Sequence, residues 1–207
     1  MKSLNQYIKE SLLCKAIYNE SILDDEDELT SNSPIEIIKS FIDDNYKVAG
    51  KLDIKESNNI YVVNCDSDVR IKNDKITQLT NDFFEWGVVK GYFNCSYCDS
   101  LKDLQGAPKK VGGSFLCNCC ESLKDLTGAP KKVDRNFYCY ECASLTSLDG
   151  APKEVDGDFD CYECKSLKTL QGAPEKVGGD FYCYECKIKF TEDDVKKVSK
   201  VKGKIIV

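Results

Sequence analysis

The sequence predicts an α+β protein whose central part is a β-solenoid, a chain wound into stacked coils. One phrase occurs five times between Gly91 and Cys186. It reads Phe-x-Cys-x-x-Cys, followed in the four complete units by x-Ser-Leu-x-x-Leu-x-Gly-Ala-Pro. The phenylalanine recurs with a 22-residue period and no slippage, at Phe93, Phe115, Phe137, Phe159 and Phe181. A fixed period of roughly 20 to 30 residues is the signature of a solenoid.

The composition of one unit explains why the coils must stack. One phenylalanine, two leucines and one valine contribute about 6–12 kcal/mol when buried, at ~1.5–3 kcal/mol per side chain. Ordering the chain of one unit costs ~1.5 kcal/mol for every residue, so a single coil cannot fold alone. The alternation x-Phe-x-Cys predicts a short strand with Phe and Cys inward. Gly-Ala-Pro predicts a corner, because glycine permits a positive φ and proline cannot donate to a ladder.

The N-terminal part is predicted to be helical. Apolar residues within positions 4–22 have helical spacing behind Ser3, and an acidic run follows at 24–28. Residues 1–32 are therefore assigned to an N-terminal helix and an acidic linker.

A second helix and two strands are predicted next. Ser33-Pro34-Ile35-Glu36 combines a serine N-cap, a proline at the first helical position and a glutamate three residues after the cap. This helix is expected to run to about Asp44. Strand-like stretches follow at Tyr46–Ile54 and Asn59–Cys65, separated by a turn-rich segment.

Residues 33–90 are predicted to form an N-terminal α/β cap that includes a degenerate repeat. Counting back one period from the first clear unit gives five matches: Ile71 under Phe93, Asn73 under Cys95, Ile76 under Cys98, Leu79 under Leu101 and Val89 under Val111. Solenoids need atypical end units because the last apolar face has no neighbour.

The clear repeats occupy residues 91–186, and residues 187–207 are predicted to form a C-terminal cap. A short helix is expected to open at Thr191-Glu192-Asp193-Asp194 and to run to about Ser199. A last strand is expected at Lys204–Val207.

Composition narrows the compartment and the partners. The 207 residues include 13 cysteines and no histidine, and the net charge is −6. Charged residues interrupt Met1 to Ile22, so no secretory signal is predicted, and no stretch approaches the ~20 apolar residues of a membrane span. We therefore expect a cytoplasmic protein with reduced thiols and no contact with membranes. The negative charge disfavours nucleic acid, whose binding depends on lysine and arginine.

The repeated phrase resembles the atypical leucine-rich-repeat units of phage and bacterial proteins, whose strand pattern is apolar-x-apolar-x-x-Asn/Cys. The resemblance covers about Val69 to Cys186 and departs from the usual plan by carrying two cysteines per unit and no asparagine ladder. It implies a right-handed leucine-rich-repeat-like solenoid that serves as a scaffold for partners. Residues 1–10 are also similar to the leaders of head-targeted proteins in T-even-type tailed phages, and Ile8-Lys9-Glu10 fits their cleavage pattern.

The paired cysteines have two interpretations. Two successive CxxC pairs, each one period after the last, match the spacing of a four-cysteine zinc site. The repeat imposes the same spacing without any metal, and cysteine is also an ordinary small core residue. We favour a ladder of dry thiols with no cofactor and keep zinc as the alternative. The candidate ligands are Cys95, Cys98, Cys117, Cys120, Cys139, Cys142, Cys161, Cys164, Cys183 and Cys186. Cys119 falls outside this pattern and is expected to be exposed.

No enzymatic signature accompanies the repeats. The CxxC pairs follow strands, whereas a thioredoxin-like site needs a helix N-terminus to lower the thiol pKa. The sequence offers no histidine base, phosphate loop or paired-carboxylate motif. We therefore expect a non-catalytic protein.

The outward strand positions carry a tyrosine stripe edged with carboxylates, called here the tyrosine face. Tyrosine supplies contact area at low entropic cost, which favours a protein-binding surface, but it also simply favours strand surfaces. The tyrosine face consists of Tyr138, Tyr140, Tyr162, Tyr182, Tyr184, Glu141, Glu163 and Glu185.

Three functions remain open at this point. The first is a phage-encoded protein-interaction or structural module that uses the tyrosine face, located in the host cytoplasm or the virion. The second is a zinc-binding cysteine-rich protein. The third is a virion-internal structural protein targeted by its N-terminal helix.

Overall fold

The computed structural model describes residues 33–58, 60–72, 74–80 and 84–207. The helix expected within residues 1–23, the acidic linker and the leader-like segment lie outside the described residues.

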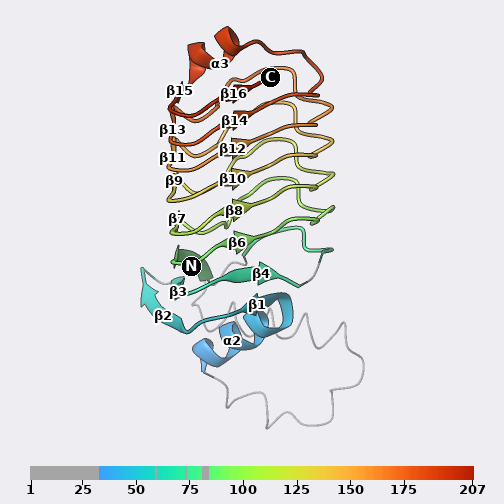
Figure 1. Ribbon diagram of the computed structural model, residues 1–207. Coiled ribbons are helices and arrows are strands. Elements are labelled where there is room, and N and C mark those ends of the chain that lie inside the picture. The colour runs from blue at the N-terminus through green and yellow to red at the C-terminus, as the bar shows by residue number, and fades with distance from the viewer. Residues whose placement is uncertain (1–32, 59, 73, 81–83) are drawn as a thin grey trace.

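The described chain is a β-solenoid of about six turns, wound with the period of the sequence repeat. Each turn contributes one short strand to each of two eight-stranded sheets that run the length of the stack (Figure 1). All neighbours in both sheets are parallel except the β1–β4 and β2–β3 pairs.

The first sheet carries the tyrosine face. Its strands are, in order, β1 (Tyr46–Val48), β4 (Val69–Ile71), β6 (Phe93–Asn94), β8 (Phe115–Leu116), β10 (Phe137–Tyr138), β12 (Phe159–Asp160), β14 (Phe181–Tyr182) and β16 (Ile205–Ile206). The backbone ladder continues past each short strand, since Cys95 N–H donates to Leu116 O at 2.8 Å and Tyr97 N–H donates to Asn118 O at 3.0 Å.

The second sheet closes the other side of each coil. Its strands are, in order, β15 (Lys200–Val201), β13 (Lys176–Val177), β11 (Glu154–Val155), β9 (Lys132–Val133), β7 (Lys110–Val111), β5 (Phe84–Val89), β3 (Ile60–Cys65) and β2 (Leu52–Ser57).

The core between the sheets is a set of identical side chains stacked along the solenoid. The five repeat phenylalanines are fully buried, and successive rings lie 5.1–5.6 Å apart. The first cysteine of each pair and both leucines of each unit are buried beside them, so the inward positions predicted from the alternation are confirmed. Gly106, Gly128, Gly150 and Gly172 have φ between +81° and +93°, which confirms the corner predicted at Gly-Ala-Pro.

The N-terminal cap begins with helix α2 (Pro34–Asn45). Ser33 caps this helix with a complete capping box, as predicted, and Glu36 returns its carboxylate to the Ser33 N–H at 2.8 Å. The prediction of a single strand over Tyr46–Ile54 was wrong. The chain turns at Gly50, so that β1 joins the first sheet and β2 joins the second.

The register predicted for the degenerate repeat was correct at one strand and wrong at the other. Val89 lies opposite Val111 as expected, but the residue opposite Phe93 is Val69 rather than Ile71. The stretch from Val69 to Val89 is longer by two positions than the stretch from Phe93 to Val111 that it underlies. The extra length lies between the two strands of this turn.

The C-terminal cap has the same extension by two positions. Phe181 pairs with Ile205 and Val177 pairs with Val201, so each partner stands two positions beyond one repeat period. Helix α3 (Glu192–Val198) begins where Thr191 accepts the Asp194 N–H, as predicted. The expected last strand narrows to β16, and the cap also adds β15, which the sequence pattern did not indicate.

Candidate functional site

The tyrosine face lies on the outward side of the first sheet, over β10, β12 and β14 and the residues that follow them. Phe and Cys point inward, so the residues between and after them point outward in columns along the solenoid. Tyr140, Tyr162 and Tyr184 form one such column. Their rings stack with centroids 4.9 Å and 5.0 Å apart. The structure therefore brings these three predicted residues into direct contact.

Tyr138 and Tyr182 belong to the neighbouring column but do not meet. Tyr138 contacts Tyr140 at a centroid distance of 6.1 Å, whereas Asp160 is the strand partner of both Tyr138 and Tyr182 and lies between them. Each phenol has its own polar partner. Asn136 Nδ2 donates to the Tyr138 hydroxyl at 2.5 Å, and the Tyr182 hydroxyl donates to Asp180 at 3.1 Å.

Asp160 lies among the residues of the tyrosine face but was not one of its predicted members. Burial raises the pKa of this carboxyl to about 6, with the charge of Asp158 adding to the effect. The hydrogen bond that it accepts from the Tyr162 N–H at 3.1 Å acts in the opposite direction. The available signal was its position, because an aspartate stands between two tyrosines at the spacing of the repeat.

The three glutamates of the tyrosine face share an unusual backbone. Glu141, Glu163 and Glu185 have φ of 55°, 57° and 53°, in the left-handed region that non-glycine residues rarely adopt. Tyr97 and Cys119 occupy the equivalent position in the earlier coils, with φ of 63° and 57°. Cys119 is thus a regular member of this column and is half-buried rather than exposed, and its thiol lies 3.9 Å from the Glu141 carboxylate of the next coil.

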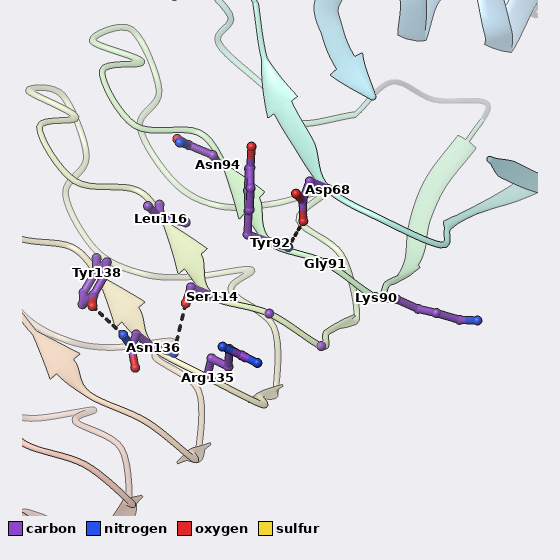
Figure 2. Close-up of a pocket in the computed structure, with 12 residues that line it drawn as sticks. Asp68, Lys90, Gly91, Tyr92, Asn94, Ser114, Leu116, Arg135, Asn136 and Tyr138 are labelled. Atoms are coloured by element: carbon purple, nitrogen blue, oxygen red, sulfur yellow. Dashed lines mark hydrogen bonds between the residues drawn. The ribbon is translucent and has the colours of Figure 1, made fainter. Parts of the chain in front are cut away.

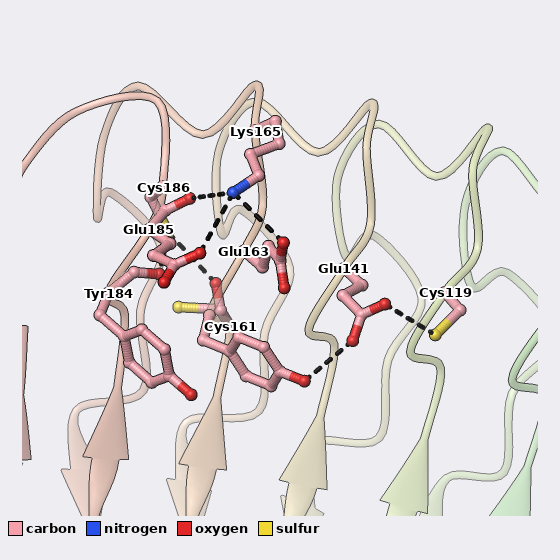
Figure 3. Close-up of polar contacts among 9 residues, drawn as sticks. Cys119, Glu141, Cys161, Glu163, Lys165, Tyr184, Glu185 and Cys186 are labelled. Carbon is pink, nitrogen blue, oxygen red and sulfur yellow. Dashed lines mark hydrogen bonds and ion pairs between the residues drawn. The ribbon is translucent and has the colours of Figure 1, made fainter.

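Hydrogen bonds and ion pairs link these glutamates to neighbouring coils (Figure 3). The Tyr162 hydroxyl donates to Glu141 at 2.8 Å, and this bond raises the pKa of Tyr162. Lys165, which the sequence analysis did not single out, lies 3.4 Å from Glu163 and 3.5 Å from Glu185 and also donates to the Glu185 carbonyl at 3.2 Å. Lys165 stands where the preceding unit has Ala143, so Glu141 has no lysine at this position of its own coil.

The thiols of the paired cysteines form hydrogen bonds with the backbone of the preceding coil. The second thiol of a pair donates to the carbonyl of the first cysteine in the preceding coil, over 3.2–3.3 Å. The pairs are Cys120 to Cys95, Cys142 to Cys117, Cys164 to Cys139 and Cys186 to Cys161. In the part of the chain that the structure describes, no three His, Cys, Asp or Glu side chains form a group that could hold a metal ion.

Burial keeps most of these thiols protonated. It raises the pKa of Cys95, Cys117, Cys139 and Cys161 well above the usual value, and that of Cys120 and Cys164 to about 12. Cys186 differs, because contact with the Cys161 thiol and the nearby Lys165 ammonium lower its pKa. Cys186 is also only half-buried.

An open groove of about 580 Å³ adjoins the tyrosine face over the earlier coils (Figure 2). Tyr92, Ser114, Arg135 and Tyr138 are among its lining residues. Ser114 belongs to a polar ladder that stands one position before the strands of the first sheet and caps the N–H of the next coil. Its members are Asp68, Ser114, Asn136, Asp158 and Asp180. The sequence signal was a short polar residue directly before most of the repeat phenylalanines.

The second sheet carries its charges as cross-coil ion pairs. Lys110 lies 3.2 Å from Asp134, and Lys132 lies 3.1 Å from Asp156. Lys176 lies 2.5 Å from Glu154. One residue of each pair is exposed and the other half-buried, and such surface pairs contribute ~0–1 kcal/mol each.

Comparisons of the chain with protein-family models, with curated proteins and with solved structures found no match. Within the described ranges, neither helix is long and apolar enough to cross a membrane.

Proposed function

We propose that this protein is a non-catalytic interaction or structural module that binds a protein partner through the tyrosine face. The observation that carries the proposal is the stacked column of Tyr140, Tyr162 and Tyr184 on the outward side of a continuous sheet. Because neighbouring coils already fix these rings, little side-chain freedom would be lost on binding. Aromatic residues held in this way are typical anchors of protein interfaces.

The core chemistry supports a binding role over a catalytic one. The sequence contains no histidine. The buried thiols are held protonated and donate to backbone carbonyls, so they are poor nucleophiles.

The same proposal includes the type of solenoid and the origin of the protein. A leucine-rich-repeat-like winding is supported by the regular period and by the parallel strands with inward Phe and Cys. A right-handed winding is supported by the general rule that crossovers between parallel strands of one sheet are right-handed. A phage-encoded protein that works in the host cytoplasm or the virion is supported by the resemblance of the repeats and of residues 1–10.

The double substitution Tyr140→Ala/Tyr162→Ala tests the proposal. We expect it to weaken binding of the partner roughly thirtyfold or more, because interface aromatics commonly contribute ~2 kcal/mol or more. The partner would be isolated from the native source with the full chain as bait and identified by mass spectrometry. Its affinity for purified variants would then be measured by calorimetry.

Two controls separate binding from folding. Lys110→Ala/Lys132→Ala changes an exposed pair of residues on the second sheet and is expected to leave the affinity unchanged. Phe137→Ala is expected to cost ~3–5 kcal/mol of folding free energy, because it empties the stacked core. If the tyrosine double variant binds the partner as tightly as the wild type, the tyrosine face is not the binding surface.

A further inference from the structure

The tyrosine face is strongly acidic in the coils where its rings gather. Glu141 and Glu185 are exposed there and four further carboxylates are half-buried, in the strand, polar-ladder and left-handed positions: Asp158, Asp160, Glu163 and Asp180. The equivalent positions of the earlier coils hold uncharged residues such as Asn94, Leu116, Ser114, Tyr97 and Cys119. The acidic and aromatic side chains therefore coincide on one patch.

Asp158 and Asp160 differ from the carboxylates of the second sheet in their hydrogen-bond and ion-pair partners. Asp134, Asp156 and Glu154 each have a lysine of a neighbouring coil within 3.2 Å. Asp158 and Asp160 instead accept backbone N–H groups, and neither forms an ion pair with any described residue. The patch contains one bridging cation, Lys165, and Lys187 stands at the same position one unit later.

We infer that the tyrosine face binds an extended, arginine- or lysine-rich segment of its protein partner, which rests on the proposed function above. A guanidinium placed over Asp160 would pair with its carboxylate between the rings of Tyr138 and Tyr182. Cations bind over the faces of tyrosine rings, and arginine makes this contact more often than lysine.

The spacing of the coils suits such a segment. Hydrogen-bonded strands lie ~4.7–4.9 Å apart, and the outward rings of Tyr140, Tyr162 and Tyr184 follow this spacing with centroids 4.9 Å and 5.0 Å apart. Same-side residues of an extended chain are ~6.6–6.8 Å apart, and long basic side chains absorb the difference. Two or three basic residues would therefore reach the column of Glu141, Glu163 and Glu185. An apolar or acidic segment would instead cover the carboxylates without supplying cations, which is unfavourable.

Defined peptides test the inference directly. Three fluorescent 12-residue peptides would alternate serine with arginine, glutamine or glutamate, and their affinity for the full chain would be measured by anisotropy. We expect the arginine peptide to bind at least about tenfold more tightly than the other two, and to weaken between about 20 and 200 mM salt because screening reduces surface attraction.

Matched variants locate the contact. Glu141→Gln/Asp160→Asn is expected to weaken binding of the arginine peptide about tenfold. Glu154→Gln/Glu175→Gln removes the same charge from the side of the second sheet, at Glu154 of β11 and at Glu175 directly before β13, and should change the affinity less than twofold. Lys165→Ala copies Ala143 and frees Glu163 and Glu185 from their cation. This variant is expected to bind the arginine peptide about threefold more tightly than the wild type.

Equal affinity for the arginine and glutamine peptides, or equal weakening by the two acidic double variants, would overturn the inference. The native partner separates it from the proposed function. If Tyr140→Ala/Tyr162→Ala abolishes capture of that partner while Glu141→Gln/Asp160→Asn does not, the cationic segment is wrong and the binding face stands. If neither variant reduces capture, the binding face itself is wrong.

Discussion

From the second pair onward, the second cysteine satisfies a backbone carbonyl that would otherwise be buried without a hydrogen-bond donor. The carbonyl of the first cysteine is buried in the core, where an unpaired acceptor costs ~1–3 kcal/mol. The thiol one coil further on supplies the donor, as Cys142 does for the Cys117 carbonyl at 3.2 Å. A thiol is small and weakly polar, so the core gains a hydrogen bond without gaining a strongly hydrated group.

This arrangement predicts that the purified protein is free of metal. A thiolate that bound zinc would no longer donate to the carbonyl, and burial already opposes ionisation of Cys120 and Cys164. Elemental analysis of protein purified without a chelator is expected to show well under one zinc per chain. Near-stoichiometric zinc that is lost together with the fold on chelation would favour the zinc-binding alternative.

Asp160 predicts a pH-dependent gain of stability on substitution. The pKa of Asp160 is about 6 in the folded chain and 3.8 ordinarily, so the folded state holds its proton more tightly. Ionisation therefore opposes folding, and this penalty is absent below about pH 4 and complete above about pH 6. Asp160→Asn copies Asn94, whose amide oxygen accepts the Ser96 N–H as Asp160 accepts that of Tyr162.

The expected result is stabilisation by about 1 kcal/mol at pH 8 and none at pH 4, after allowance for solvent screening. Urea unfolding of both proteins at the two pH values measures it. A variant that is less stable than the wild type at pH 8 would show that the charge of Asp160 already has a favourable partner.

At the scale of the coil, the glycines two positions before the repeat phenylalanines and the polar ladder form matched pairs. A Cβ on Gly157 would lie 2.1 Å from the Asn136 amide oxygen, and one on Gly179 would lie 2.1 Å from the Asp158 carboxylate. Arg135 takes the position of Gly157 one coil earlier. The polar-ladder residue of the coil before it is Ser114, whose side chain is shorter than that of Asn136. At Gly157 and Gly179 the capping side chain of the preceding coil is thus the nearest atom that a new side chain would meet.

This pairing predicts that Gly157→Ala costs about 1–3 kcal/mol and that Asn136→Ser recovers part of the loss. The Asn136 side chain must move away from the new methyl group and release the Asp158 N–H, which it holds at 2.9 Å. A double-mutant cycle by denaturant unfolding measures the coupling. Rescue remains partial because the Arg135 backbone carbon also lies 2.9 Å from the new Cβ.

The sequence predicted the repeated coil because each unit poses the same packing problem. Phe137 and Cys139 alternate in one strand, and the period places the same pair above and below them. The register of β4 was harder to predict. Val69 and Ile71 are both apolar and stand two positions apart, so alternation alone cannot decide which of them lies under Phe93. The roles of Asp160 and Lys165 depend on how far side chains reach between coils, which residue spacing does not encode.

At the scale of the whole molecule, the N-terminal end of the phenylalanine stack is closed by aromatic rings in a different geometry. Trp86 meets Phe93 edge-on at 6.0 Å, and Tyr46 and Phe84 meet Trp86 edge-on at 5.2 Å and 5.8 Å. The Tyr46 hydroxyl donates to the Leu79 carbonyl at 2.7 Å and fixes the cap to the first turn. Edge-on contacts end the parallel stack without leaving a flat apolar ring face for another coil.

Removal of residues 1–90 is therefore expected to leave the repeats insoluble or molten. The fragment 91–207 would lose Ile71, Leu79, Phe84 and Trp86, all buried in the intact chain, and would expose the end of the core and the unpaired edge of both sheets. A fragment that begins at residue 33 keeps α2 and β1 to β5 and serves as the matched control. Size-exclusion chromatography and near-ultraviolet circular dichroism compare the two. Because each coil obtains most of its stability from its neighbours, a soluble 91–207 fragment with a cooperative transition would mean that the internal interfaces alone outweigh an uncovered end.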